Sequence, residues 1–119
     1  MSTRNTPTRG EVWLVKFDPT VGSEIRKTRP AVVISSDSIG KLPIKLVAPM
    51  TEWKDAFRSC AWLVRIDPDV SNGLAKSSAA DVLQLRGVDT VRFVSRIGHL
   101  APAQVTRIAA AVGVAVQVP

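Results

Sequence analysis

The sequence contains few of the side chains on which many enzymes depend. Among its 119 residues there are one cysteine, one histidine and no tyrosine. One cysteine excludes an internal disulfide, and with one histidine it is too little for a Cys/His metal cluster. Cys60 precedes an apolar segment and is expected to be a buried, inert thiol. His99 stands alone, which excludes acid–base catalysis by paired histidines, and we expect it to be structural or exposed.

Long apolar runs and familiar catalytic motifs are also missing. No stretch reaches the roughly 18 apolar residues of a membrane-spanning helix, and residues 1–8 are polar, unlike a secretory signal. We therefore expect a cytoplasmic protein without membrane association, with a flexible tail at 1–8 and one domain at 9–119. The sequence has no glycine-rich phosphate loop, metalloprotease motif or serine nucleophile elbow, and we expect neither a metal nor a small-molecule cofactor.

Basic residues are in excess. Lysine and arginine number 16 against 10 acidic residues, which gives a formal charge of +6 and a sequence pI near 10.3. Such a balance is consistent with a polyanionic partner, which could be RNA, DNA or an acidic protein. Hydrophobic residues make up 45% and charged residues 22%, as in an ordinary globular domain rather than a disordered chain.

The most informative stretch is residues 18–37, DPTVGSEIRKTRPAVVISSD, a turn-rich loop followed by an apolar run. Its loop carries four charges in close succession, on Glu24, Arg26, Lys27 and Arg29. Pro30 favours an extended conformation for Arg29, which predicts that this arginine lies at the mouth of a buried strand. A guanidinium held there loses little freedom on binding, so it is well placed to recognise phosphate. The alternative is a basic loop that is merely solvated.

The hydrophobic pattern predicts a mainly β protein. Trp13, Val15 and Phe17 share one face of a half-buried strand, and Lys45 is expected to face outward from its strand. Strands are expected at residues 12–17, 31–35, 44–50, 60–66, 78–86 and 92–98, followed by a helix at 101–117. Pro102 suits the first position of that helix. Short strands separated by turns and closed by one helix suggest a small twisted or barrel-like antiparallel sheet.

Three segments together resemble the N-terminal half of the MazF/PemK (Kid) toxins of bacterial toxin–antitoxin pairs. They are RGEVWLV at 9–15, DPTVGSE at 18–24 and TRPAVVI at 28–34. The resemblance implies an SH3-like small β-barrel that pairs into a homodimer, and a toxin of a type II system that its cognate antitoxin holds inactive. It also implies a metal-independent, sequence-selective endoribonuclease, which cleaves single-stranded RNA through attack by the RNA 2′-hydroxyl.

The same resemblance assigns catalytic roles to two residues. Arg29 matches the catalytic arginine of the family, and Thr51 matches its strand-end threonine. The family mechanism gives Arg29 an acid–base part, but we favour charge stabilisation, since an arginine pKa above about 12 makes it a poor base at neutral pH. Thr51 could donate to a phosphate oxygen or to the leaving oxygen. Without the family match, a hydroxyl that satisfies its own turn would be the favoured interpretation of Thr51.

Further positions are candidates for holding the RNA. The expected substrate-binding residues are Ser23, Glu24, Arg26, Lys27, Trp53, Gln84 and Arg86. Glu24 could read a base edge or orient Arg29, the Gln84 amide could read a base, and Arg86 is a candidate for phosphate. Trp53 could stack on an unpaired base, or it could instead cap the core or enter a dimer interface. An ordinary surface role is the alternative for the others.

Departures from the family pattern leave some properties open. Residues 25–28, IRKT, replace the small residues that many relatives have before the Arg-Pro pair, so the loop is more basic and bulkier. This leaves the preferred RNA sequence open. The arginine–aspartate pair of the Kid type is replaced by Asp81 and Leu83. Two other functions are alternatives: a binder of DNA gyrase, like the CcdB toxins that share the fold, and a module that binds antitoxin without cutting RNA.

Overall fold

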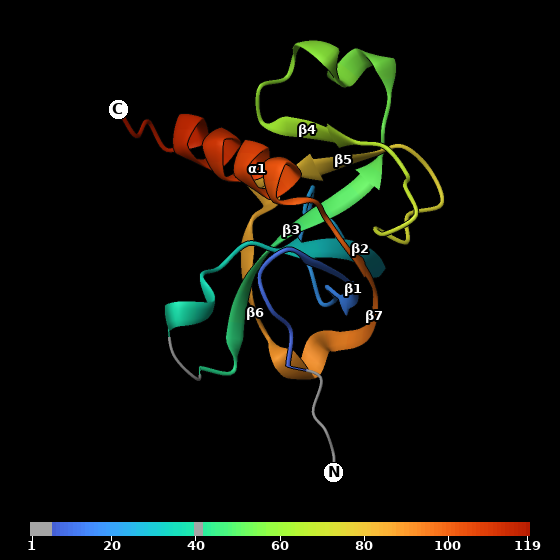
Figure 1. The fold of residues 1–119 in the computed structure, drawn as a ribbon, viewed down its shortest axis with the longest axis vertical. Helices are drawn as coiled ribbons and strands as arrows, with labels where there is room; N and C mark the ends of the chain where they lie inside the picture. Colours follow the sequence, from blue (N-terminus) through green and yellow to red (C-terminus); the bar gives the residue numbers. More distant parts are fainter. Residues whose placement is uncertain (1–5, 40–41) are drawn as a thin grey trace.

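The computed structural model describes residues 6–39 and 42–119 of the chain. The strands are β1 (Glu11–Lys16), β2 (Thr28–Val33), β3 (Ile44–Glu52), β4 (Leu63–Ile66), β5 (Ser78–Asp81), β6 (Arg86–Asp89) and β7 (Phe93–His99) (Figure 1). Short 3-10 helices occur at η1 (Asp37–Ile39), η2 (Asp55–Ser59), η3 (Val82–Gln84) and η4 (Thr90–Arg92), and α1 spans Pro102–Ala115. Residues 1–5 of the expected tail lie outside the described residues.

The strands form one antiparallel sheet. Its order is β4-β5-β3-β2-β1-β7, and β6 pairs with β3 beside this path. β3 joins the parts of the sheet, because it pairs with β2 along one edge and with β6 and then β5 along the other. The expected mainly β fold with a C-terminal helix is confirmed. The sheet is not a closed barrel, because β4 and β7 lie at opposite ends of the order and no ladder joins them in the described ranges.

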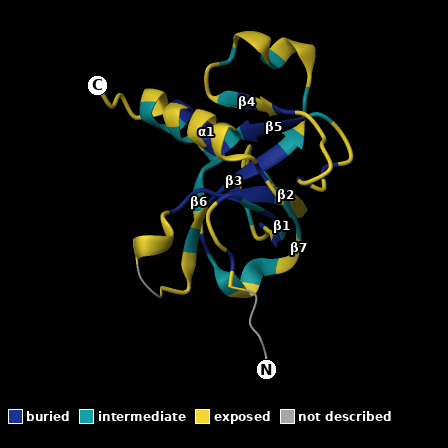
Figure 2. Ribbon diagram, in the orientation of Figure 1, coloured by how far each residue is buried: buried dark blue, intermediate teal, exposed yellow. Residues whose placement is uncertain are grey.

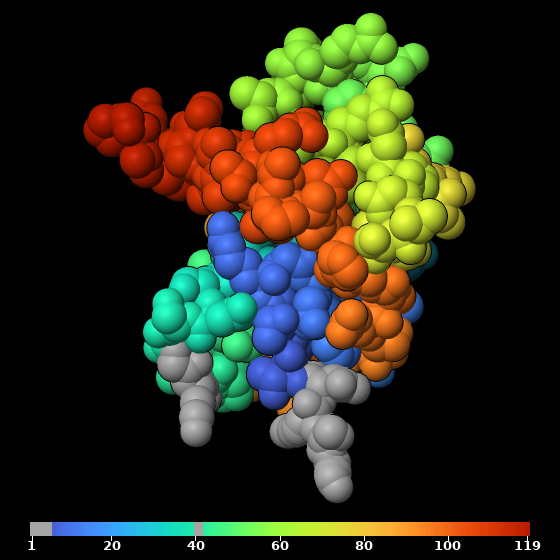
Figure 3. Space-filling view, viewed as in Figure 1, coloured from blue at the N-terminus to red at the C-terminus, as the bar shows by residue number. Residues whose placement is uncertain are grey.

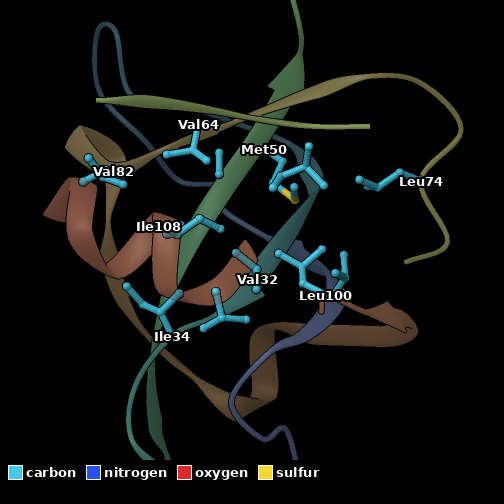
Figure 4. Packing of buried hydrophobic residues seen from close by; sticks show 14 residues of the cluster. Val32, Ile34, Met50, Val64, Leu74, Val82, Leu100 and Ile108 are labelled. Atoms are coloured by element: carbon cyan, nitrogen blue, oxygen red, sulfur yellow. The ribbon is translucent and has the colours of Figure 1, made fainter. Parts of the chain in front are cut away.

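Two hydrophobic clusters lie on opposite faces of this sheet, because successive strand residues alternate between faces. The cluster between the sheet and α1 includes Val32, Met50, Val64 and Ile108 (Figure 4). The other cluster includes Trp13, Val15, Phe17, Ala31 and Val47, so the first three share a face as expected. Strands β1, β2 and β3 are therefore buried on both sides, and Figure 2 shows the densest burial along them.

The segment around Cys60 differs from the expectation. β4 begins at Leu63 rather than at residue 60. The reason is the turn that follows η2: the N–H of Cys60 donates to the carbonyl of Phe57 at 2.9 Å, and the N–H of Leu63 donates to that of Cys60 at 3.1 Å. Cys60 is consequently half-buried, and its expected full burial was wrong.

Two further expectations about strands were wrong. The single strand expected at 78–86 is interrupted by η3, because the Asp81 carboxylate accepts a hydrogen bond from the N–H of Leu83 at 3.0 Å and turns the chain. Lys45 does not face outward but is half-buried. Instead Ile44 and Leu46 are 48% and 40% exposed, since this end of β3 runs beside β6 and away from α1 (Figure 1).

The α-helix covers one face of the sheet with a single stripe of side chains. It begins at Pro102, as expected, and ends at Ala115, two residues before the expected end. Its buried residues Val105, Ile108 and Ala111 lie at helical spacing and pack into the first cluster. No helix among the described residues is long and apolar enough to cross a bilayer.

Candidate active site

Arg29 and Thr51 lie across from each other where two strands separate. Arg29 is near the start of β2, and Thr51 is near the end of β3. The ladder between these strands ends where Ala31 pairs with Pro49, and Pro30 has no N–H with which to extend it. Continuing the register by two residues places Arg29 opposite Thr51 and on the same face. Both residues line one cavity of about 440 Å³.

The Arg29 side chain is exposed and its main chain is fixed. β2 is exposed at its first residues and buried from Ala31 onward, so the expectation that Arg29 lies at the mouth of a buried strand is confirmed. Its backbone pairs with Val15 of β1. Among residues 6–39 and 42–119, no carboxylate lies within ion-pair distance of its guanidinium. This cation is therefore held at its base and free to bind an anion at its tip.

The remaining wall of this cavity has an apolar part and a charged part. The apolar part is formed by Leu14, Pro30, Met50, Leu74 and Ile97. The charged part adds Lys76 and Glu52, whose Nζ and Oε1 atoms are 3.3 Å apart. Lys76 was not among the residues expected from the sequence, where the signal was only a lysine shortly before a strand.

The loop that carries Lys76, residues 67–77, is closed by hydrogen bonds. Asp67 accepts one from Ser77 Oγ at 2.7 Å and one from Arg65 Nε at 2.9 Å, and these bonds lower the pKa of its carboxyl group. In the middle of the loop, the buried Asn72 donates from Nδ2 to the carbonyl of Asp67 at 2.9 Å. These hydrogen bonds thus fix the conformation of the loop that forms part of the cavity wall.

Two glycines let this loop lie directly against β7. A Cβ atom on Gly73 would be 2.0 Å from the carbonyl oxygen of Ile97, and one on Gly98 would be 2.3 Å from that of Ser71. The two backbones therefore touch without intervening side chains. Figure 3 shows the yellow-green loop packed against the orange strand. This contact sets the position of Lys76 relative to the sheet.

A second cavity, of about 430 Å³, lies on the side of the Trp13 cluster. It is lined by Phe17, Ser23, Glu24, Ile25, Pro49, Leu83, Gln84, Leu85 and Arg86. Four of the expected substrate-binding residues, Ser23, Glu24, Gln84 and Arg86, are thus brought together from distant parts of the sequence. The structure places them in a different cavity from the one that Arg29 and Thr51 line.

The Gln84 amide holds the loop between β1 and β2. Its Nε2 donates to the carbonyl of Ser23 at 3.0 Å, and its Oε1 accepts from the N–H of Ile25 at 3.1 Å. Glu24 is also engaged within the loop, because its Oε1 accepts from the N–H of Val21 at 2.8 Å. In this arrangement Gln84 positions the loop, so reading a base would require its amide to exchange partners.

Replacing Gln84 with leucine is expected to loosen this loop. Both hydrogen bonds are lost, and a net loss of about 1 kcal/mol corresponds to an exchange rate of the Ile25 amide proton roughly fivefold higher. Hydrogen–deuterium exchange measured at this amide checks the expectation. The neighbouring Leu83, which is 62% exposed, offers a matched control, since Leu83→Gln should leave the exchange unchanged. Equal protection of the Ile25 amide proton from exchange in both variants would contradict the role of Gln84 in holding the loop.

The other basic residues of this region differ in how freely they can move. Arg86 donates from NH1 to the carbonyl of Phe17 at 2.8 Å, and its guanidinium lies 5.9 Å from the Phe17 ring centroid. It braces the end of β1. Arg26 and Lys27 are exposed, although the N–H of Lys27 donates to the Asp18 carboxylate at 3.0 Å. Their side chains can follow a polyanion along the loop.

Trp53 lies outside both cavities. It is half-buried, with its ring centroid 5.7 Å from that of Phe57 in an edge-on arrangement, and the Arg65 guanidinium stacks 5.3 Å from it. Its indole Nε1 is buried and has no hydrogen-bond partner. Trp53 therefore does not line the cavity that Arg29 and Thr51 share.

The chemistry that the first cavity offers is that of a cation and a hydroxyl. His99 is exposed at the end of β7. Partial burial raises the pKa of Asp81, but this residue lines neither cavity. No group of three potential ligands from histidine, cysteine, aspartate and glutamate gathers within the described segments. A guanidinium opposite a hydroxyl can orient a phosphodiester and stabilise the negative charge that develops on it.

Proteins of known family are similar to this chain over most of its length. The family model of the PemK-like, MazF-like toxins of type II toxin–antitoxin systems matches residues 8–116. The chain belongs to the PemK/MazF family. Among curated relatives, "Endoribonuclease MazF9" of Mycobacterium tuberculosis is 30% identical over 106 residues, which cover 84% of this chain and 87% of the relative. "Endoribonuclease PemK" of Escherichia coli is 39% identical over a shorter segment, 36% of this chain and 33% of the relative.

Solved structures share the PemK/MazF fold. MazF from Deinococcus radiodurans superposes with a TM-score of 0.79 at 19% identity, covering 96% of this chain and 99% of that one. A mycobacterial endoribonuclease in complex with its cognate antitoxin gives a TM-score of 0.75 at 16% identity, with coverage of 96% and 98%. These relatives carry the names MazF and PemK, so the alternative of a CcdB-like gyrase binder is not favoured.

Proposed function

We propose that this chain is the toxin of a type II toxin–antitoxin system and acts as a sequence-selective endoribonuclease on single-stranded RNA. The observation that carries the proposal is the position of Arg29 and Thr51, which come from different strands and line one cavity. Membership of a family with relatives named endoribonucleases supports it. The excess of basic residues suits an RNA substrate.

RNA supplies the nucleophile for this reaction. The 2′-hydroxyl oxygen attacks the adjacent phosphorus, the bond to the 5′-oxygen breaks, and the products are a cyclic phosphate and a free 5′-hydroxyl. One proton leaves the 2′-oxygen and one reaches the 5′-oxygen. Arg29 stabilises the charge on the phosphoryl oxygens, and Thr51 donates a hydrogen bond to one of them or to the leaving oxygen. The reaction requires no metal ion in this scheme.

The expected partners follow from the same family. A cognate antitoxin would bind the chain and hold it inactive, and two copies of the chain would pair as a homodimer. We propose that the chain acts in the cytoplasm, where it would meet both its RNA substrate and its antitoxin. A complex with an antitoxin is recorded for the mycobacterial endoribonuclease that shares the fold.

An assay with purified protein tests the reaction. Cleavage of a long RNA is expected to continue in excess chelator, and the new ends should be a 2′,3′-cyclic phosphate and a 5′-hydroxyl. An RNA with one 2′-deoxynucleotide immediately before a mapped cut should resist cleavage there and remain cut elsewhere. Cleavage at the deoxynucleotide, or ends that carry a 5′-phosphate, would contradict attack by the 2′-hydroxyl.

A further inference from the structure

A second cation stands in the wall of the Arg29–Thr51 cavity. Lys76, on loop 67–77, lines this cavity together with Arg29 and Thr51, and its ion-pair partner Glu52 follows Thr51 directly in β3. The apolar residues Leu74 and Ile97 line the same cavity. A nucleotide bound there would meet basic groups from two separate elements around an apolar surface.

The position of Lys76 is fixed while its charge stays accessible. Its loop is closed by the Asp67 carboxylate and is seated on β7 through Gly73. The Lys76 and Glu52 side chains are nevertheless 69% and 61% exposed. Ion pairs as exposed as this one contribute only about 0 to 1 kcal/mol. A phosphodiester, whose single negative charge is shared by two non-bridging oxygens, can therefore replace Glu52 as the partner of the ammonium group at little energetic cost.

We propose that Lys76 forms a second phosphate subsite, which binds an RNA phosphate next to the one at Arg29, and that Glu52 occupies this subsite in the absence of RNA. The inference rests on the proposed function, since the RNA strand that passes Arg29 is the one that reaches Lys76. Glu52 then acts as a competitor for the cation and weakens the binding of RNA. Lys76 contacts the backbone, so it contributes affinity but no base preference.

The test measures binding as a function of salt. The probe is a fluorescent RNA with a 2′-deoxynucleotide before the mapped cut, so that it binds without being cleaved. Lys76→Met is expected to weaken binding roughly two- to fivefold and to reduce the slope of log K against log salt by about 0.7, the value for one phosphate contact on a single strand. Lys76→Arg should keep the wild-type slope.

A matched variant controls for net charge. Arg107 is exposed on α1 and lines neither cavity, so Arg107→Met removes one charge as well but should leave the slope unchanged. Equal slopes for Lys76→Met and wild type, or equal changes in Lys76→Met and Arg107→Met, would overturn the subsite. Because the Lys76–Glu52 pair is exposed, the melting temperature should stay within about 2 °C of wild type in every variant.

Removing the Glu52 carboxylate, the proposed competitor, is expected to strengthen RNA binding. Glu52→Gln is expected to tighten binding of the same probe roughly two- to fivefold, and this gain should vanish in the double variant with Lys76→Met. A gain that persists in the double variant would show that Glu52 acts through general charge, which would overturn its role as the competitor for Lys76.

The two proposals fail in different ways. If wild-type protein cuts no RNA, or the cut requires no 2′-hydroxyl, the proposed function fails. If wild-type protein cuts RNA as expected and the slope for Lys76→Met is unchanged, the catalytic assignment stands and only the second subsite is wrong.

Discussion

Arg29→Ala is expected to lower the rate of RNA cleavage by roughly a thousandfold or more, while the fold stays intact. The Arg29 guanidinium, opposite Thr51, can place a positive charge against the phosphoryl oxygens of the scissile phosphate in the transition state. Since it is exposed and no carboxylate pairs with it in the described part of the chain, its removal leaves no buried charge unpaired. The melting temperature should therefore change little.

Single-turnover cleavage of a short RNA measures this effect. Arg29→Lys keeps the charge but loses the planar fork, so an intermediate rate is expected, at least tenfold below wild type. Arg107→Ala, on the exposed side of α1, is the control for loss of an arginine and should cleave at the wild-type rate. If Arg29→Ala cleaves RNA with a rate close to wild type, the catalytic assignment is wrong.

Gly98→Ala is expected to destabilise the protein by about 3 kcal/mol, which corresponds to a fall of roughly 10 °C in melting temperature. The added Cβ would lie 2.3 Å from the carbonyl oxygen of Ser71 and 2.7 Å from that of Asn72. Backbone atoms cannot rotate away as a flexible side chain can, so β7 and loop 67–77 must move apart. This displacement also moves Lys76, so the affinity for RNA should fall together with the stability.

Gly113 provides the matched control for this substitution. It lies in α1, and a Cβ atom there would meet only a Val118 side-chain atom at an ordinary 3.7 Å. Gly113→Ala should therefore stabilise the helix, by up to about 1 kcal/mol. Thermal unfolding followed by circular dichroism compares the two variants. Melting temperatures that agree within error would contradict the tight contact between loop and strand.

Much of the fold could be predicted from local signals. The alternation of Trp13, Val15 and Phe17 predicted β1, and Pro102 predicted the start of α1. Predictions failed where a side chain or a turn changed the backbone path. The Asp81 carboxylate stops a strand that the pattern would continue, and the turn at Cys60 delays the start of β4. Neither contact leaves a periodic signal in the sequence.

The site was predictable only in part, because its geometry depends on strand register. Pro30 indicated that Arg29 stands at a strand entrance, but only the register between β2 and β3, continued two residues beyond the end of their ladder, places it opposite Thr51. Register also depends on residues far away in the chain. Three features became apparent only from the three-dimensional structure: the separation of Arg29 and Thr51 from four of the expected RNA-binding residues into different cavities, the engagement of Gln84 with the loop, and the contribution of Lys76.

Arg29 and Thr51 lie on strands that are buried on both faces of the sheet. This restricts the ways in which such a protein can be inhibited. Local unfolding of these strands would expose much of the core, so its free-energy cost would approach that of global unfolding. An inhibitor can act at a lower free-energy cost in two ways. It can block the cavity, or it can displace the flanking loops, which are held by a few polar contacts. The pair would then regain its geometry as soon as the inhibitor dissociates, without a refolding step.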